Sequence, residues 1–216
     1  FLKNASYAKA SSVLLTLVCV FMVGCGKSNT SSPNPSPSKS QASNLPSASL
    51  ETTTNGTKFV SNEHNFEMIF PKNWGISMNV EGYVVKAEDG NGILISVTTE
   101  KVPEKYKNFN LEKASLKDRR EFLLGIEDGL RKKYPNAMFS LEQLDHRLDG
   151  KVCVATKGTI LLSQAKYADL TQYFHFIIHN GIVYSVNYSM LSGIGNGGKS
   201  DVDSAWEALR TFHLTK

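Results

Sequence analysis

A glycine-rich stretch near the end of the sequence has the spacing of a phosphate-binding loop. Gly193–Ser200 reads GIGNGGKS, which fits G-x-x-x-x-G-K-[ST] and also contains G-x-G-x-x-G. In loops of this kind, backbone amides and a lysine hold phosphate groups at the start of a helix. Nucleotide binding is therefore the first chemical hypothesis that the sequence raises.

The residues around this stretch argue against a nucleotide. The preceding segment alternates apolar residues with Ser185, Asn187 and Ser189, whereas the strand before a phosphate loop is usually apolar on both faces. Asp201 and Asp203 follow the loop and would repel a triphosphate. We interpret Gly193–Ser200 as a loop in which Ser200 caps a final helix.

Two histidines four residues apart raise a second hypothesis, a metal site. On a helix, His175 and His179 would share one face and could bind zinc together. On a strand they would lie roughly 13 Å apart, too far for one metal. The alternation of Phe174, Phe176 and Ile178 favours a strand. We expect no metal or other cofactor, and both histidines on the face opposite these apolar residues.

The cysteines suggest attachment rather than catalysis. Cys153 lies in KVCVATKG, which is typical of a buried strand thiol and has no neighbour that would activate a nucleophile. We find no Ser-His or Cys-His arrangement and no convincing acid pair, so we expect no catalytic residue. Cys25, in contrast, follows an apolar run at 13–23, with only Gly24 between them.

That apolar run predicts a secretory signal peptide. It is shorter than the about 20 residues that a membrane-spanning helix needs, and two lysines precede it. It ends in Met22-Val23-Gly24-Cys25, which resembles the lipobox of bacterial lipoproteins, with Met22 where that family most often has Leu. The resemblance implies cleavage between Gly24 and Cys25, and a lipid, such as palmitate, carried by Cys25.

The sequence predicts three regions. Residues 1–24 form the signal peptide, residues 25–56 form the lipidated cysteine with a disordered Ser/Pro-rich tether, and residues 57–216 form a single folded domain. The whole sequence has 24 basic and 20 acidic residues, a net charge of +4. Several of the lysines lie before residue 57, and no basic patch indicates a nucleic-acid partner.

Periodicity within the folded region predicts an α+β fold, an antiparallel β-sheet packed with helices. A first helix is expected at 111–134, or from Ser115 if Ser115 and Asp118 form a capping box, and a second at 201–212. Asp149-Gly150 and Asn180-Gly181 predict two hairpins. The expected strands are 66–70, 74–80, 83–87, 92–102, 138–148, 151–162, 170–179 and 182–190.

Three features of these elements bear on function. The strand at 182–190 alternates, so we expect one buried face and one wetter face. Trp206 lies on the apolar stripe of the last helix, and we interpret it as a core anchor. Gly125 and Gly129 share one face of the first helix, which indicates either local weakness or close approach to the sheet.

Three segments together resemble PsbP-like and DcrB-like domains: HNFEMIFPKNW at 64–74, YFHFIIHNGIVYSVNYS at 173–189 and AWEALRTFHL at 205–214. The resemblance implies an α/β/α sandwich that serves as a binding or scaffold module in the cell envelope, without a shared catalytic site. Trp74 matches a tryptophan of the family pattern, and we interpret it as structural.

These observations predict a non-catalytic, lipid-anchored envelope protein. Its membrane contact would be the lipid on Cys25, on the periplasmic face of an outer membrane or the outer face of a plasma membrane. Its partner would be an envelope protein or a small ligand. The alternative is an extracytoplasmic hydrolase whose site the sequence does not reveal.

Overall fold

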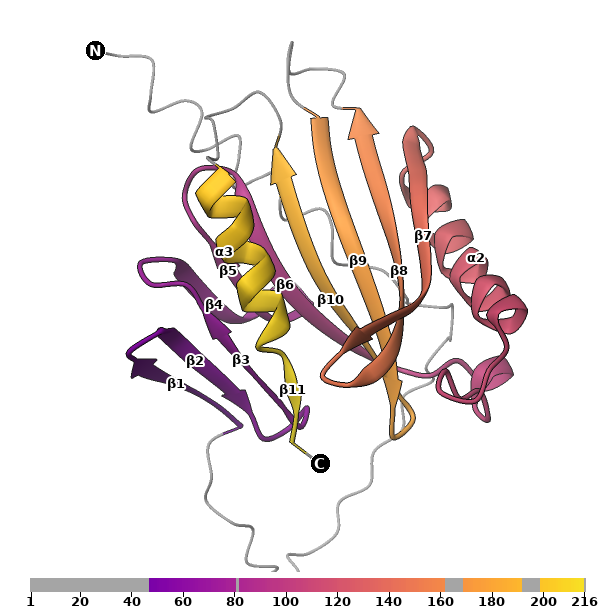
Figure 1. Cartoon of the computed structure of the whole chain (residues 1–216), viewed down its shortest axis with the longest axis horizontal. Coiled ribbons are helices and arrows are strands. Elements are labelled where there is room, and N and C mark those ends of the chain that lie inside the picture. The colour runs from indigo at the N-terminus through magenta and orange to yellow at the C-terminus, as the bar shows by residue number, and fades with distance from the viewer. Residues whose placement is uncertain (1–46, 81, 162–168, 192–198, 216) are drawn as a thin grey trace, which may run out of the picture.

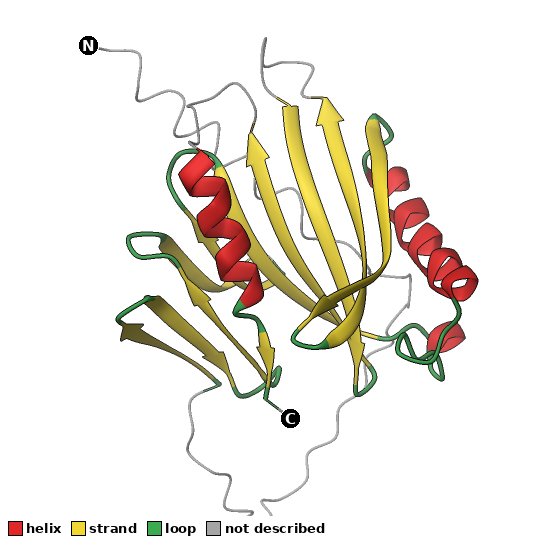
Figure 2. Cartoon of the chain, in the orientation of Figure 1, coloured by secondary structure: helices red, strands yellow, loops and turns green. Residues whose placement is uncertain are grey.

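The computed structural model describes residues 47–80, 82–161, 169–191 and 199–215, whose strands form two sheets (Figures 1 and 2). The four-stranded sheet has the order β1-β2-β3-β11, and its strands are β1 (Ala48–Thr53), β2 (Gly56–Ser61), β3 (Phe66–Phe70) and β11 (His213–Leu214). The seven-stranded sheet has the order β4-β5-β6-β10-β9-β8-β7. Its strands are β4 (Gly75–Val80), β5 (Tyr83–Glu88), β6 (Ile93–Lys101), β7 (Ala137–Leu148), β8 (Lys151–Leu161), β9 (Asp169–His179) and β10 (Ile182–Leu191).

The strand pairings confirm the predicted antiparallel α+β fold. Each pairing between described strands is antiparallel, including β7 with β8 and β9 with β10. Both predicted hairpin turns are present. Asp149 and Gly150 have φ of 53° and 68°, and Asn180 and Gly181 have φ of 48° and 74°. Positive φ at both central residues is what a tight two-residue hairpin turn requires.

Helix α2 (Leu116–Lys133) begins at the predicted capping box. The Asp118 amide donates to Ser115 Oγ at 3.2 Å, and the Ser115 amide donates to the Asp118 carboxylate at 3.3 Å. The helix therefore starts after Ser115 rather than at Leu111. Of the helices that the structure describes, none has the length and apolarity to cross a membrane.

Helix α3 (Lys199–Arg210) starts and ends about two residues earlier than the sequence indicates. Ser200 lies within its first turn, so the prediction that Ser200 caps this helix is wrong. The predicted apolar stripe is confirmed, because Ala205 and Leu209 are buried and Val202 and Trp206 pack against the same core. Phe212 lies beyond the helix end and is buried as well.

The seven-stranded sheet has two covered faces. On one, which we call the α3 face, Cys153, Ile177, Tyr184 and Tyr188 join a core with α3 and the four-stranded sheet. On the opposite face, the α2 face, alternate residues such as Val154, Phe174, Phe176 and Val183 pack with α2. In Figure 1, α3 and the small sheet lie together, and α2 runs along the β7 edge. The molecule is therefore layered on both sides of the large sheet.

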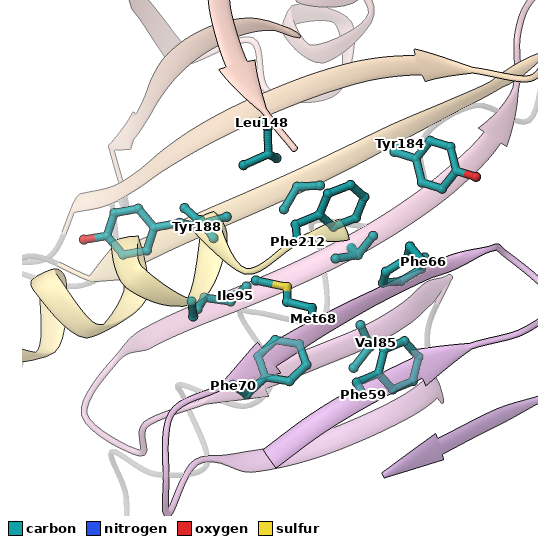
Figure 3. Close-up of a cluster of buried hydrophobic side chains, with 14 of the residues drawn as sticks. Phe59, Phe66, Met68, Phe70, Val85, Ile95, Leu148, Tyr184, Tyr188 and Phe212 are labelled. Carbon is teal, nitrogen blue, oxygen red and sulfur yellow. The ribbon is translucent and has the colours of Figure 1, made fainter. Parts of the chain in front are cut away.

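The core of the α3 face is centred on aromatic rings (Figure 3). The Phe66 ring lies 5.5 Å from Phe59, 5.3 Å from Phe212 and 6.2 Å from Tyr184, between ring centroids. Phe66 comes from the alternating strand β3, so its side chain points away from solvent and towards the large sheet.

The small sheet corrects the predicted organisation. The sequence assigns residues 48–53 to the disordered tether, but they form β1, so the folded part starts before residue 57. Leu50 of β1 is 42% exposed, and the strand is held by its pairing with β2 rather than by a buried face. Strands β2 and β11 also escaped prediction. Strand β11 has only two residues, and β2 starts at the predicted boundary between tether and domain.

The prediction that one face of β10 is more exposed to solvent is also wrong. Asn187 and Ser189 are 5% and 2% exposed, and Ser185 is half-buried. Strand β10 lies in the middle of the large sheet between β6 and β9, and the sheet is covered on both faces. The alternation in sequence therefore marks two chemically different buried faces.

Candidate functional site

The predicted lipidation site and most of the glycine-rich stretch lie outside the described residues. This is true of Gly24 and Cys25, the predicted cleavage and lipidation site, and of positions 193–198 of the glycine-rich stretch. Lys199 and Ser200 form the start of α3. Cleavage and lipidation at Cys25 therefore stay predictions.

His175 and His179 lie on strand β9, as predicted, so they do not chelate a metal in the helical manner. The His175 ring is 3% exposed, has its Nδ1 3.2 Å from the Val186 carbonyl and lies 5.5 Å from the His146 ring centroid. Burial, with the nearby His146, lowers the pKa of His175 to about 4. Across the described ranges, no group of three His, Cys, Asp or Glu residues could hold a metal ion.

Cys153 and the two tryptophans behave as core residues. Burial raises the pKa of the Cys153 thiol to about 12, so the thiol stays protonated at neutral pH. Trp206 of α3 packs edge-on against Tyr173 and His175, with ring centroids 5.7 Å apart in each case. Trp74 packs against the same core.

The structure brings a different set of residues together, on the α2 face. A cleft of about 180 Å³ lies between α2 and strands β6, β9 and β10. Helix α2 packs mainly on β7 and β8, near one edge of the sheet, so it covers the central strands less completely. The cleft opens where this coverage ends.

One wall of the cleft is apolar. Helix α2 contributes Phe122, Ile126 and Leu130, and β9 contributes Phe174 and Phe176. The Phe174 and Phe176 rings stand parallel, with an interplanar angle of 4° and centroids 6.1 Å apart. This wall can bury the apolar body of a ligand.

The floor on β6 and β10 is polar. Ser185 on β10 lies beside Thr98 on β6, and both line the cleft with Asn187. The Ser185 hydroxyl donates to Asn187 Oδ1 at 2.8 Å, which fixes the orientation of that amide. Oriented polar groups beneath apolar walls are characteristic of small-molecule sites.

Glu100 is the acidic residue of the cleft. It lies on β6 opposite Val183, and both residues line the cleft. Burial raises the pKa of its carboxyl group. Among the described residues, Glu100 makes no ion pair or hydrogen bond, whereas the carboxylate of Glu127, which is more deeply buried, accepts from the Thr156 hydroxyl at 2.6 Å. The Glu100 carboxylate is thus placed to receive a partner from outside the chain.

The two glycines of α2 keep the cleft open. A Cβ on Gly125 would lie 2.9 Å from the Tyr106 hydroxyl, and a Cβ on Gly129 would meet nothing within 4 Å. Neither glycine is needed for close approach to the sheet, which was one of the two explanations that the sequence left open. Both line the cleft. The missing side chain of Gly129 leaves open space there, and that of Gly125 makes room for the Tyr106 hydroxyl.

The 3₁₀ segment η2 (Glu104–Tyr106) forms the mouth of the cleft. The Tyr106 ring meets Phe122 edge-on at 5.1 Å between centroids. The Lys105 ammonium lies 4.6 Å from the centroid of the Tyr106 ring, a cation–π contact. The titratable residues that line the cleft are Glu100, Lys105 and Tyr106.

Sequence reasoning missed this cleft. The glycine pair and the polar residues of β10 were both visible, but each had a simpler explanation when taken alone. The combined signal has two parts. Two glycines share one face of a helix, and the strands opposite that face carry polar residues at alternate positions.

The fold is an antiparallel α+β sandwich, and its similarity to known proteins lies at the level of solved structures. No family model and no curated protein matches the sequence. The chain is similar to the solution structure of cyanobacterial PsbP (CyanoP) from Synechocystis sp. PCC 6803, with 14% identity, a TM-score of 0.45, and coverage of 81% of this chain and 98% of that one. PsbP is the family that the sequence resembles.

Two further structures are similar at the same low level. One is a crystal structure from Bacteroides thetaiotaomicron VPI-5482, with 15% identity and a TM-score of 0.46; the match covers 76% of this chain and spans half, 50%, of that one. The other is LpqN, involved in cell envelope biogenesis of Mycobacterium tuberculosis, with 12% identity, a TM-score of 0.42, and coverage of 78% and 91%. These likenesses assign neither a ligand nor an activity to this chain.

Proposed function

We propose that this chain is a lipid-anchored protein of the cell envelope whose folded domain binds a small ligand, without catalysis, in the cleft under α2. The membrane contact is the lipid on Cys25, and the residues before β1 form the connection to the domain. The lipobox-like Met22-Val23-Gly24-Cys25 supports the anchor. The cleft supports the binding role.

The observation that carries the binding role is the composition of the cleft. Apolar walls from α2 and β9 stand over a polar floor on β6 and β10, and two helix glycines face the opening. Each glycine weakens an exposed helix by about 1 kcal/mol relative to alanine. A helix that only shielded a core would have no physical need for them at these two positions.

A fragment screen on the full chain tests the binding role. Ligand-observed NMR would compare the wild type with Gly129→Leu, which adds a side chain at a cleft-lining position where a Cβ meets nothing within 4 Å. Asp128→Leu is the matched control, because it places the same side chain at the preceding position of α2, which does not line the cleft. We expect Gly129→Leu to abolish fragment binding and the control to retain it. Fragments that bind both variants equally would contradict a site in the cleft.

A separate experiment tests the anchor. Cells expressing the full chain are grown with a radiolabelled fatty acid, and the protein is compared with a Cys25→Ser variant. We expect label in the wild type and none in the variant, with Cys153→Ser as the control that keeps the label. An unlabelled wild-type chain would remove the lipid anchor from the proposal.

A further inference from the structure

Glu100 is the acidic residue of the cleft lining, and no described group neutralises it. Glu112 accepts from the Val152 amide at 2.6 Å, and Glu142 pairs with Arg120 at 3.1 Å. Glu100 has no such partner among the described residues, although it is half-buried at the cleft. A half-buried carboxylate without a partner is stabilised when a cation or a hydrogen-bond donor binds to it.

We infer that the ligand of the cleft is a small organic ammonium ion, whose charged nitrogen meets the Glu100 carboxylate and whose apolar body lies against Phe122, Phe174 and Phe176. This inference rests on the proposed binding function and adds the chemical class of the ligand to it. The polar atoms of Ser185 and Asn187 are available on the floor for a second contact to the same molecule.

The charges of the cleft favour an ammonium ion over an anion. Lys105 is the basic residue of the lining, and its ammonium is held against the Tyr106 ring at the mouth. Glu100 lies on the sheet itself, opposite Val183, where the walls lower the local polarity. The Glu100 carboxylate would attract an ammonium ion at this position and would repel an anion.

The volume of the cleft limits the size of the ligand. About 180 Å³ is less than the roughly 300–1,000 Å³ of pockets that hold drug-sized molecules. A single ring or short aliphatic chain with one amine fits this space. The parallel rings of Phe174 and Phe176 offer such a body apolar contact in the cleft.

Three probes with one body and three head groups test this inference on the full chain at neutral pH. They are phenethylammonium, phenethyl alcohol and 3-phenylpropanoate, and their affinities are measured by NMR titration. Glu100→Gln removes the charge and keeps the shape, and Glu63→Gln, in an exposed turn away from the cleft, is the control. We expect the ammonium probe to bind best, and Glu100→Gln to weaken it about tenfold while changing the alcohol little.

The other outcomes separate this inference from the proposed function. If Gly129→Leu blocks the probes but Glu100→Gln does not change their order, the cleft binds ligands and the ammonium class is wrong. Strongest binding of 3-phenylpropanoate would also overturn the inference and would make Lys105 the contact. If no probe binds at millimolar concentration, the ammonium inference fails, while the fragment screen still decides whether the cleft binds anything.

Discussion

The two faces of the large sheet differ in how completely they are covered. The α3 face is closed by a helix and a second sheet. The side chains of Phe66, Phe70 and Phe212 there are at most 1% exposed. The α2 face carries one helix, which packs mainly over β7 and β8 and leaves a cleft over the central strands. The α3 face is a closed core, whereas part of the α2 face lines an open cleft.

The difference shows which departures from simple packing carry information. On the α2 face, two glycines lie in the middle of a helix, and Ser185 and Asn187 replace apolar residues on a central strand. Local rules of helix propensity and core patterning are commonly broken at functional sites. The departures converge on one cleft, which makes a shared functional cause more economical than separate structural ones.

The largest expected effect comes from truncating one ring on each face. Phe66→Ala removes a ring that contacts three others, and we expect it to lower the free energy of unfolding by about 3–5 kcal/mol. Phe176→Ala borders an existing opening, so we expect a cost at least about 1 kcal/mol smaller. Urea denaturation of both variants measures this. Equal costs would show that the cleft wall is packed as tightly as the closed core.

A second prediction concerns pH and the closed face. The pKa of His175 is lowered to about 4 in the folded chain, chiefly by burial, while an unfolded histidine titrates near 6.5. The unfolded state therefore binds more protons between these values. Stability is full above pH 6.5 and falls as the pH drops towards 4, by up to about 3 kcal/mol.

Urea denaturation at several pH values checks this slope. His175→Gln should flatten it between pH 6.5 and 4, and His179→Gln on the same strand should retain it. A slope that persists in His175→Gln would assign the acid sensitivity to other groups. The result sharpens the comparison, because it measures how strictly the α3 face excludes charge.

Much of the fold could be predicted from local signals. The hairpins at Asp149-Gly150 and Asn180-Gly181 and the capping box at Ser115 and Asp118 are set by residues next to each other in sequence. The apolar stripe of α3 followed from its period. These features need no knowledge of what packs against them.

The features that could not be predicted depend on contacts between distant segments. Strand β1 has few apolar residues and is held by pairing with β2, and β11 consists of two residues that pair with β3 across most of the chain. The burial of Asn187 depends on the second layer over the sheet. The cleft requires α2, β6, β9 and β10 together, so no single window of the sequence contains it.

The smallest expected effect concerns the glycines of α2. It tests most directly whether the α2 face is less stable than it could be because of its cleft. Gly129→Ala should raise the free energy of unfolding by about 0.5–1 kcal/mol, because alanine favours the helix and its Cβ would meet nothing within 4 Å. Gly125→Ala should gain less or lose stability, since its Cβ would lie 2.9 Å from the Tyr106 hydroxyl and displace the cleft mouth.

Thermal unfolding of the two variants measures this difference, and the fragment screen applied to both gives the functional counterpart. A stabilised Gly129→Ala that also binds fragments more weakly would show that the glycine is kept for the volume of the cleft rather than for the fold. A destabilised Gly129→Ala would mean instead that the helix needs glycine there for a backbone reason. The α2 face would then be a less completely covered version of the closed one, with no trade between stability and binding.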